Sequence, residues 1–394
     1  MERNRMELLP GVFLTLVRRR EDESACFRAA LLRQLSREEA ALNALLPEAL
    51  LYGTQRHPDG SLAAALTALH AKAEPLVRRV GEVQAVGFTA VFDHDPAQFA
   101  ALMQCLAGVL LAPDTRFGQL KKEAVSLALQ RWDEADEAED DPFAAMCEHM
   151  CCFEDYAIPV RGERPDAGPN YYQKLSKHYR AVLSQSPVEL YYAGAIPAKL
   201  AVQTIADCFA VMPRGELDFD LGTDIRMNAV EAEPRVLDQS GAQGTNRVTV
   251  GWRLGEVMEE PDPPVLEALA GAYRALTAEL ETDVLLDVHK GILLARCDTD
   301  PDRAEETITA LKEAMAQLSA GVPAEVLDLG RAARVQALRD LESDPAALES
   351  FWLEQDLLGL ELAPDEYAAF IQEATSAAVA EAAGGTECDA ILLE

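Results

Sequence analysis

The chain has 394 residues, 67 acidic and 35 basic, which gives a formal net charge of −32 at pH 7. This charge disfavours a general affinity for nucleic acid or for an anionic membrane, because both would repel the protein. Hydrophobic residues make up 49% of the chain, which excludes disorder of the whole chain, and the length predicts two domains of roughly 200 residues each.

The beginning of the chain, Met1 to Pro10, lacks an apolar stretch long enough for a signal peptide. No run of about 18 apolar residues predicts a membrane span. The eight cysteines are sparse and irregularly spaced, which favours reduced thiols. We therefore expect a soluble, cytoplasmic protein.

The first predicted elements are a strand and a helix. Apolar residues alternate over 12–16, as in a half-buried strand. Ser36 and Glu39 have the spacing of a capping box, which predicts that a helix starts there. Pro47 lies inside this helix, and proline in a helix interior removes one backbone hydrogen bond at a cost of about 3 kcal/mol. We therefore expect a kink or an early end near Leu46.

A repeated pattern of short motifs runs through the rest of the chain. Asp-x-Asp-Pro occurs at 93–96 and at 298–301, each time between a predicted strand and a predicted helix; the aspartate suits a helix N-cap and the proline suits the first turn. An Asp-Pro step then follows at 141–142 and at 344–345. The helices between these markers are predicted at 97–111, 118–131, 302–318 and 324–341. Collinear markers about 205 residues apart indicate a tandem duplication.

The predicted fold is α+β, with two tandem homologous domains that each contain a mostly antiparallel sheet covered by helices. The second copy opens with an alternating strand over 248–254, the counterpart of 12–16. A further strand is expected at 188–193. The predicted domains are 1–212 and a shortened 247–394, joined by a linker over 213–246 that is rich in Gly, Asp and Glu.

The segment 36–54, the strand before it and the duplication resemble the pitrilysin/insulinase family of zinc peptidases. The resemblance covers nearly the whole chain. It rests on the order of the elements more than on any single motif. It implies an insulinase-like fold of the LuxS/MPP type. The most similar branch is the non-catalytic YmfF-like branch, whose members are associated with a pathway that modifies elongation factor P and accompany a second insulinase-like protein.

The resemblance also identifies the positions at which active family members bind zinc. Their helix carries His-x-x-Glu-His a few residues before Gly-Thr, so that two histidines hold zinc and the glutamate acts as general base. The two histidine positions here are Ala44 and Glu48, and the base position is Pro47. The third ligand, a glutamate seven residues after another glutamate, corresponds to Gln130 after Glu123. The resemblance thus implies a degenerate zinc site, a metallopeptidase homologue without catalytic residues, and neither metal nor cofactor.

Some heterodimers of the family use an arginine and a tyrosine from the second half of a helper subunit to grip substrate, just before a strand that often contains His-Lys-Gly. His289-Lys290-Gly291 matches this element. The preceding segment 276–288 holds neither arginine nor tyrosine, and Tyr273-Arg274 lies upstream in the reverse order. We therefore expect the usual helper pair to be missing.

One cysteine-rich segment invites a metal or redox interpretation. Cys147 and Cys151 are spaced to share one helix face, whereas His149 and Cys152 are not. A closed zinc site would need further ligands from a distant segment. Packing of the cysteines as small buried hydrophobes is the preferred interpretation.

These observations favour a partner or substrate-binding subunit over an enzyme. It would pair with a zinc-bearing insulinase-like relative, and its acidity would suit unfolded or basic peptides. The resemblance implies a role in peptide processing or in elongation factor P modification. Two alternatives stay open: a peptidase or other hydrolase that uses residues outside the family pattern, and a homodimeric peptide-binding module.

Overall fold

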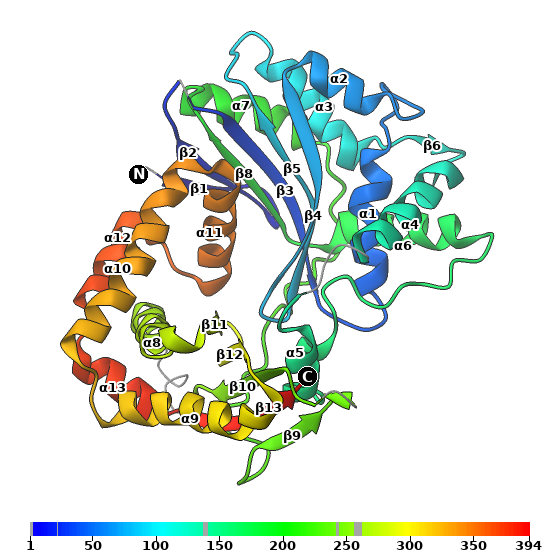
Figure 1. The fold of residues 1–394 in the computed structure, drawn as a ribbon. Helices are drawn as coiled ribbons and strands as arrows, with labels where there is room; N and C mark the ends of the chain where they lie inside the picture. The colour runs from blue at the N-terminus through cyan, green and yellow to red at the C-terminus, as the bar shows by residue number, and fades with distance from the viewer. Residues whose placement is uncertain (1–2, 22, 137–140, 242–243, 256–261) are drawn as a thin grey trace. The chain divides into compact units, whose positions relative to one another are not determined.

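The computed structural model describes residues 3–21, 23–136, 141–241, 244–255 and 262–394. The chain divides into two compact units (Figure 1). Unit 1 consists of 1–140, 158–222 and 343–361, and unit 2 consists of 141–157, 223–342 and 362–394. Each unit contains one large sheet, and the predicted α+β class with mostly antiparallel sheets is confirmed.

The sheet of unit 1 has six strands in the order β1-β2-β8-β3-β5-β4. Only β2 and β8 pair in parallel; the other neighbours are antiparallel. The strands are β1 (Arg3–Leu9), β2 (Val12–Arg18), β3 (Ala25–Gln34), β4 (Ala71–Val80), β5 (Val83–Phe92) and β8 (Val188–Gly194). A small hairpin, β6 (Thr115–Arg116) with β7 (Gln119–Leu120), belongs to the same unit.

Both faces of this sheet are buried, and alternation along β3 shows which helices cover each face. Phe27 and Leu31 belong to a core with side chains of α1, α3, α6 and α7. The intervening residues Arg28 and Leu32 face α11 instead. The helices of the unit are α1 (Ala40–Leu51), α2 (Leu62–Ala68), α3 (Phe99–Leu111), α4 (Lys122–Asp136), α6 (Tyr171–Gln185), α7 (Ala198–Phe209) and α11 (Pro345–Leu358).

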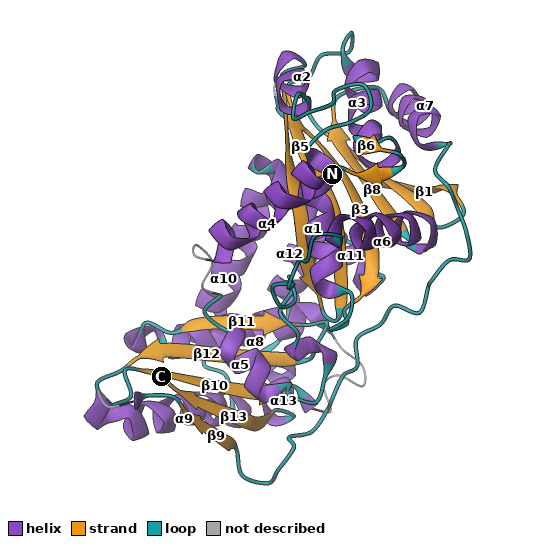
Figure 2. Cartoon of the chain, turned by 90° about the vertical axis from the view of Figure 1, so that its right-hand side faces the viewer, coloured by secondary structure: helices purple, strands orange, loops and turns teal. Residues whose placement is uncertain are grey.

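The sheet of unit 2 has five strands in the order β11-β12-β10-β13-β9, visible in Figure 2. The strands are β9 (Arg235–Asp238), β10 (Arg247–Arg253), β11 (Asp283–Asp287), β12 (Ile292–Asp298) and β13 (Glu387–Leu393). Only β13 and β9 pair in parallel, like β8 and β2 in unit 1. Taken from β9 to β11, the five strands match the order and directions of β2-β8-β3-β5-β4 in unit 1, whereas β1 has no counterpart in the five-stranded sheet. The tandem duplication is thus present in the topology.

This topology corrects one predicted correspondence. The expected correspondence between the strand at 12–16 in the first repeat and the strand at 248–254 in the second is wrong, because β10 occupies the central position that β3 has in unit 1. The counterpart of β2 is β9, a four-residue strand within the segment predicted as a linker. Its shortness conceals the repeat, since four residues carry too little alternation to predict a strand.

Helices cover both faces of the second sheet as well. On one face, Trp252 of β10 contacts Tyr273 of α8 with ring centroids 5.3 Å apart. On the other face, α5 packs through Met146, Cys147 and Met150. The helices of the unit are α5 (Ala144–Met150), α8 (Pro263–Leu276), α9 (Ala304–Ala320), α10 (Ala324–Asp340), α12 (Pro364–Glu373) and α13 (Ser376–Gly384). Unit 2 also contains the short 3-10 helices η1 (Asp155–Ala157), η4 (Ala278–Leu280) and η5 (Pro301–Arg303). A further 3-10 helix, η6 (Leu341–Ser343), precedes α11.

The two repeats exchange one segment each. Residues 141–157, which include α5, come from the first half of the chain and pack in unit 2, whereas 343–361, which include α11, come from the second half and pack in unit 1. Each exchanged segment begins at one of the two Asp-Pro steps. The compact units therefore differ from the predicted domains, 1–212 and 247–394 with the linker 213–246, because the sheet face that a segment covers decides its unit, not its order in the chain.

The helix that carries the family motif also differs from its prediction. It runs without interruption through Pro47 to Leu51, so the expected early end near Leu46 is wrong. Pro47 is buried, and packing of the helix outweighs the lost hydrogen bond. The expected capping box is wrong too: the helix starts at Ala40, Ser36 accepts backbone bonds only through its carbonyl, and the Glu39 carboxylate bonds Arg33.

Three other predicted helices are confirmed. The helices expected at 97–111, 302–318 and 324–341 correspond to α3, α9 and α10. The helix expected at 118–131 begins four residues later, because Phe117 and Gly118 form the turn of the β6–β7 hairpin with positive φ angles of 54° and 74°. None of the helices in the described part of the chain is long and apolar enough to cross a membrane.

Candidate functional site

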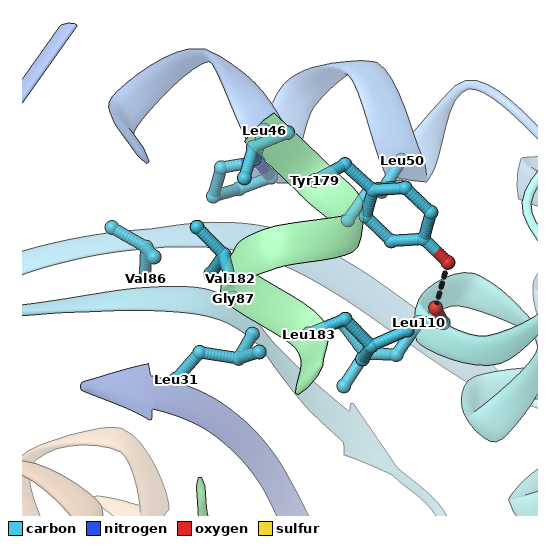
Figure 3. Close-up of a pocket in the computed structure, with 10 residues that line it drawn as sticks. Leu31, Leu46, Leu50, Val86, Gly87, Leu110, Tyr179, Val182 and Leu183 are labelled. Carbon is cyan, nitrogen blue, oxygen red and sulfur yellow. Dashed lines mark hydrogen bonds between the residues drawn. The ribbon is translucent and has the colours of Figure 1, made fainter. Parts of the chain in front are cut away.

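The inner side of α1 is filled with apolar contacts. Figure 3 shows Leu46 and Leu50 beside Tyr179 and Val182 of α6, above the sheet. The remaining space between these side chains is about 10 Å³, which is at most one water molecule. The Tyr179 hydroxyl donates a 2.5 Å bond to the carbonyl of Leu110, so its one polar group is satisfied. This side of α1 therefore serves the core.

Two of the positions that the resemblance matches to the zinc site lie on this helix and have no ligand atom in their side chains. The Ala44 residue is buried, with 4% of its surface exposed, and its methyl group belongs to the same core as Leu46. Pro47 is buried one turn further along and lines the apolar space beside Leu46. Neither residue can bind a metal ion or accept a proton.

The other two positions form hydrogen bonds and an ion pair of their own. Glu48 lies on α1 one turn after Ala44, and its Oε2 is 2.6 Å from Nη1 of Arg131 on α4. Gln130 is exposed on α4 and donates a 2.8 Å bond from Nε2 to Glu134. An ion pair thus joins α1 to α4 at Glu48, one of the positions that the resemblance predicts for a zinc ligand.

These residues do not fit a zinc ion. Zinc in a peptidase needs three protein ligands, and of the matched positions only Glu48 offers a carboxylate, which a guanidinium already neutralises. Throughout the described part of the chain, no three His, Cys, Asp or Glu side chains are grouped so that they could hold a metal ion.

A buried chain of polar groups, which the sequence did not reveal, lies beside α1. The ring Nε2 of His178 donates a 2.7 Å bond to Asn43 Oδ1, and Asn43 Nδ2 donates a 2.9 Å bond to Gln84. Gln84 in turn donates to the carbonyls of Ala40 and Val160. Burial lowers the pKa of His178 to about 4, so the ring is neutral near pH 7. A neutral chain with each amide bonded holds α1 in place and offers no charged base.

Three residues in and near the His-Lys-Gly element have partners within unit 2. Tyr273 is fully buried and donates to the carbonyl of Leu311, and Arg274 donates to the carbonyl of Val284. Lys290 is also fully buried; its Nζ is 2.7 Å from Glu154, and it bonds the carbonyl of Asp224. Tyr273 and Lys290 therefore belong to the interior of unit 2, whereas Arg274 lies at its surface.

The cysteine-rich segment packs in the core of unit 2. Cys147 and Cys151 are buried with Met146 and Met150 against β12 and β13, whereas Cys152 is exposed. Burial raises the pKa of the Cys151 thiol to about 12, so it is protonated and a poor nucleophile near pH 7. His149 meets the carbonyl of Arg235 rather than a cysteine.

Comparison with known proteins places these features in a family context. No family model matches the chain. A Bacillus subtilis (strain 168) protein described as a probable inactive metalloprotease, YmfF, is 21% identical over 390 residues, which cover 91% of this chain and 90% of that protein.

Three solved structures have the same fold over nearly the whole chain. A conserved protein from Enterococcus faecalis V583 has a TM-score of 0.81 at 17% identity, covering 99% of this chain and 98% of that one. A peptidase M16 inactive domain from Pseudomonas fluorescens has a TM-score of 0.75 at 12% identity, with 100% and 98% covered. An insulinase family protease predicted from Yersinia pestis has a TM-score of 0.66 at 15% identity, with 99% and 92% covered. The predicted resemblance is thus confirmed: this chain has the fold of the M16, or pitrilysin/insulinase, peptidases and is similar along most of its length to a probable inactive relative of them.

Proposed function

We propose that this chain is a non-catalytic M16 homologue that acts as the partner or substrate-binding subunit of a zinc-bearing relative. The proposal includes a cytoplasmic location and a role in peptide processing or in the modification pathway of elongation factor P, which the YmfF-like resemblance suggests. The net charge of −32 favours unfolded or basic peptides as the material that such a complex handles.

The ion pair between Glu48 and Arg131 supports the absence of catalysis most directly. A carboxylate at this position, where active family members have a histidine, would be uncompensated between two helices, which is costly unless a cation lies beside it. Arg131 supplies that cation at 2.6 Å. The buried apolar side chains of Ala44 and Pro47, at two further matched positions, also support the absence of a zinc site.

Metal content and proteolysis test this part of the proposal. The purified chain, dialysed against zinc, should hold far less than one equivalent and should hydrolyse no peptide. A variant with Ala44→His, Pro47→Glu, Glu48→His and Gln130→Glu, which restores the four matched positions, serves as the comparison and should hold more zinc. Stoichiometric zinc in the unaltered chain, together with hydrolysis, would refute the assignment.

Co-purification tests the partner role. A zinc-bearing insulinase-like protein encoded beside this chain should bind it and should process peptides faster in the complex than alone. A stable monomer that leaves the relative's activity unchanged would contradict the proposal. A homodimer with no affinity for such a relative would favour the alternative of a self-associating peptide-binding module.

The alternative of a hydrolase that uses the cysteine-rich segment has less support. Its two helix-face thiols, Cys147 and Cys151, are buried, and a nucleophile must reach its substrate. Activity of the purified chain that disappears in Cys147→Ala but persists in Cys388→Ala would restore this alternative.

A further inference from the structure

The β6–β7 hairpin of unit 1 carries an exposed aromatic residue in a strained conformation. The turn consists of Phe117 and Gly118, both with positive φ, which is the type I′ geometry that normally selects Asn-Gly. Phe117 has 94% of its surface exposed, so burial does not compensate for the strain. Strained conformations cluster at active sites and ligand-binding segments, so this turn is a candidate contact for a ligand.

A cavity of about 470 Å³ opens beside this hairpin. Its lining, all from unit 1, comprises Asp59, Arg116, Phe117, Gln119, Leu120, Lys121, Lys122, Glu123 and Tyr172. This volume is in the range of small-ligand sites and holds one or two amino-acid residues.

The cavity is built on fixed partners. Lys121 Nζ lies 2.6 Å from Asp59 and 2.7 Å from Asp114, which ties the end of the hairpin to the segment after α1. The backbone N–H of Leu120 donates a 2.9 Å bond to Ser176 Oγ on α6. A site that is already ordered loses little entropy when a ligand binds.

Two cations of the lining lie over aromatic rings. The guanidinium of Arg116 is 5.6 Å from the ring centre of Phe117, and Nζ of Lys122 is 5.0 Å from that of Tyr172. Within the described residues, neither cation forms an ion pair with a carboxylate. Both charges are therefore available to an anion, and both rings offer an apolar face next to it.

We propose that this cavity binds a peptide carboxylate that is followed or preceded by an apolar side chain. The two cations would receive the carboxylate, while Phe117 and Tyr172 would pack on the apolar side chain. A single carboxylate suits the site better than a polyanion, because the charge of −32 repels an extended acidic segment. The carboxylate could be the chain end of the peptide or an Asp or Glu side chain.

Fluorescence anisotropy of labelled peptides on the full-length chain tests the site. The first probe is a Gly-Ser peptide that ends in Leu-Phe with a free carboxylate, and the second is its C-terminal amide. A third probe, also amidated, carries Glu-Phe inside the sequence. The free acid or the Glu-Phe probe should bind at least about tenfold more tightly than the plain amide, as expected for a charge-assisted contact. The difference between these two probes identifies the source of the carboxylate.

Two variants separate recognition from folding. Arg116→Glu with Lys122→Glu should abolish the preference for the carboxylate, whereas the exposed-site control Arg303→Glu should leave it unchanged. Phe117→Asn should raise the melting temperature, because asparagine suits the turn, and should still weaken binding about tenfold or more. Phe153→Asn, which alters another exposed phenylalanine, serves as its control.

The proposal fails if the plain amide binds as well as both carboxylate probes, or if the double charge reversal leaves binding unchanged. It also fails if Phe117→Asn stabilises the chain without weakening binding. The choice of a peptide as ligand rests on the proposed function, but the readouts are separate. Loss of peptide binding in an unchanged complex with the zinc-bearing relative would refute this site alone.

Discussion

Replacing Glu349 by glutamine removes the negative charge from an ion pair that has no access to solvent. Glu349 lies on the exchanged helix α11, and its Oε1 is 2.5 Å from Nη1 of Arg28 on the central strand β3. Both side chains have 0% of their surface exposed. The second carboxylate oxygen is 3.3 Å from Arg78, so one acidic group serves two arginines.

The variant should lose about 3–5 kcal/mol of unfolding free energy, the usual cost of leaving a buried charge without its partner. Arg28 has few other contacts to compensate: its Nη1 also reaches the carbonyl of Glu349 at 3.3 Å, and its guanidinium lies 5.5 Å from the ring of Tyr191. Arg78 is partly exposed and can turn toward water. Most of the loss therefore comes from Arg28.

Fluorescence of Trp352 provides the assay, because this buried residue lies on α11, less than one turn from Glu349. Urea unfolding of a background with Trp132→Phe and Trp252→Phe reports on α11 alone. As a control, Glu306→Gln disrupts an exposed pair with Arg303 and should cost less than about 1 kcal/mol.

A double variant distinguishes charge from packing. Arg28→Met with Glu349→Leu should recover most of the loss, since apolar residues of similar volume often replace a buried pair without cost. If Glu349→Gln costs less than about 1 kcal/mol, water must reach the pair and the reasoning from burial is refuted. If the double variant is as unstable as the single one, the ion pair itself is stabilising.

Three further outcomes follow from the structure. The unfolded pKa of His178 near 6.5 falls to about 4 in the fold, so the folded chain binds fewer protons between these values. Stability should therefore fall as the pH drops from 6.5 to 4, by up to about 3 kcal/mol relative to His178→Gln; equal urea midpoints of the two proteins at every pH would contradict this. In the folded chain a thiol reagent should modify the exposed Cys152, whereas Cys151, whose pKa burial raises to about 12, should react only after unfolding, as peptide mass mapping can show. Gly330→Ala should lower the melting temperature sharply, at a cost of about 3 kcal/mol, because its new Cβ would lie 2.3 Å from the carbonyl carbon of Gly271 on the neighbouring helix α8; an unchanged melting temperature would show that α8 and α10 can separate.

Features with a strong local pattern were predictable from the sequence. The apolar periodicity of α3 and α10 and the alternation of β10 each span enough residues to indicate the element and its approximate bounds. The Asp-Pro markers revealed the duplication for the same reason. The matching of Ala44 and Gln130 to zinc-ligand positions stays a prediction of the family resemblance, based on spacing along two helices.

Features that depend on tertiary contacts were not predictable. No local sequence pattern distinguishes α11 from a helix that packs within its own half of the chain. The exchange of segments therefore could not be predicted from the sequence. The polar chain from His178 to Gln84 joins residues far apart in sequence, and each is unremarkable alone. Pro47 is a second example of a feature that tertiary contacts decide. Its low helix propensity predicts that α1 ends there, but tertiary packing keeps the helix intact to Leu51.

The contacts at the four matched positions also predict what a restored zinc site would require. Restoring histidines at Ala44 and Glu48 and a glutamate at Gln130 would leave Arg131 beside the metal, where its charge opposes a divalent cation. It would also introduce polar rings where Ala44 now packs in an apolar core. Zinc affinity should therefore rise further when Arg131 is replaced by leucine in the restored variant. The helix needs no metal ion to hold its position, because its apolar side belongs to the core and Glu48 on its other side pairs with Arg131.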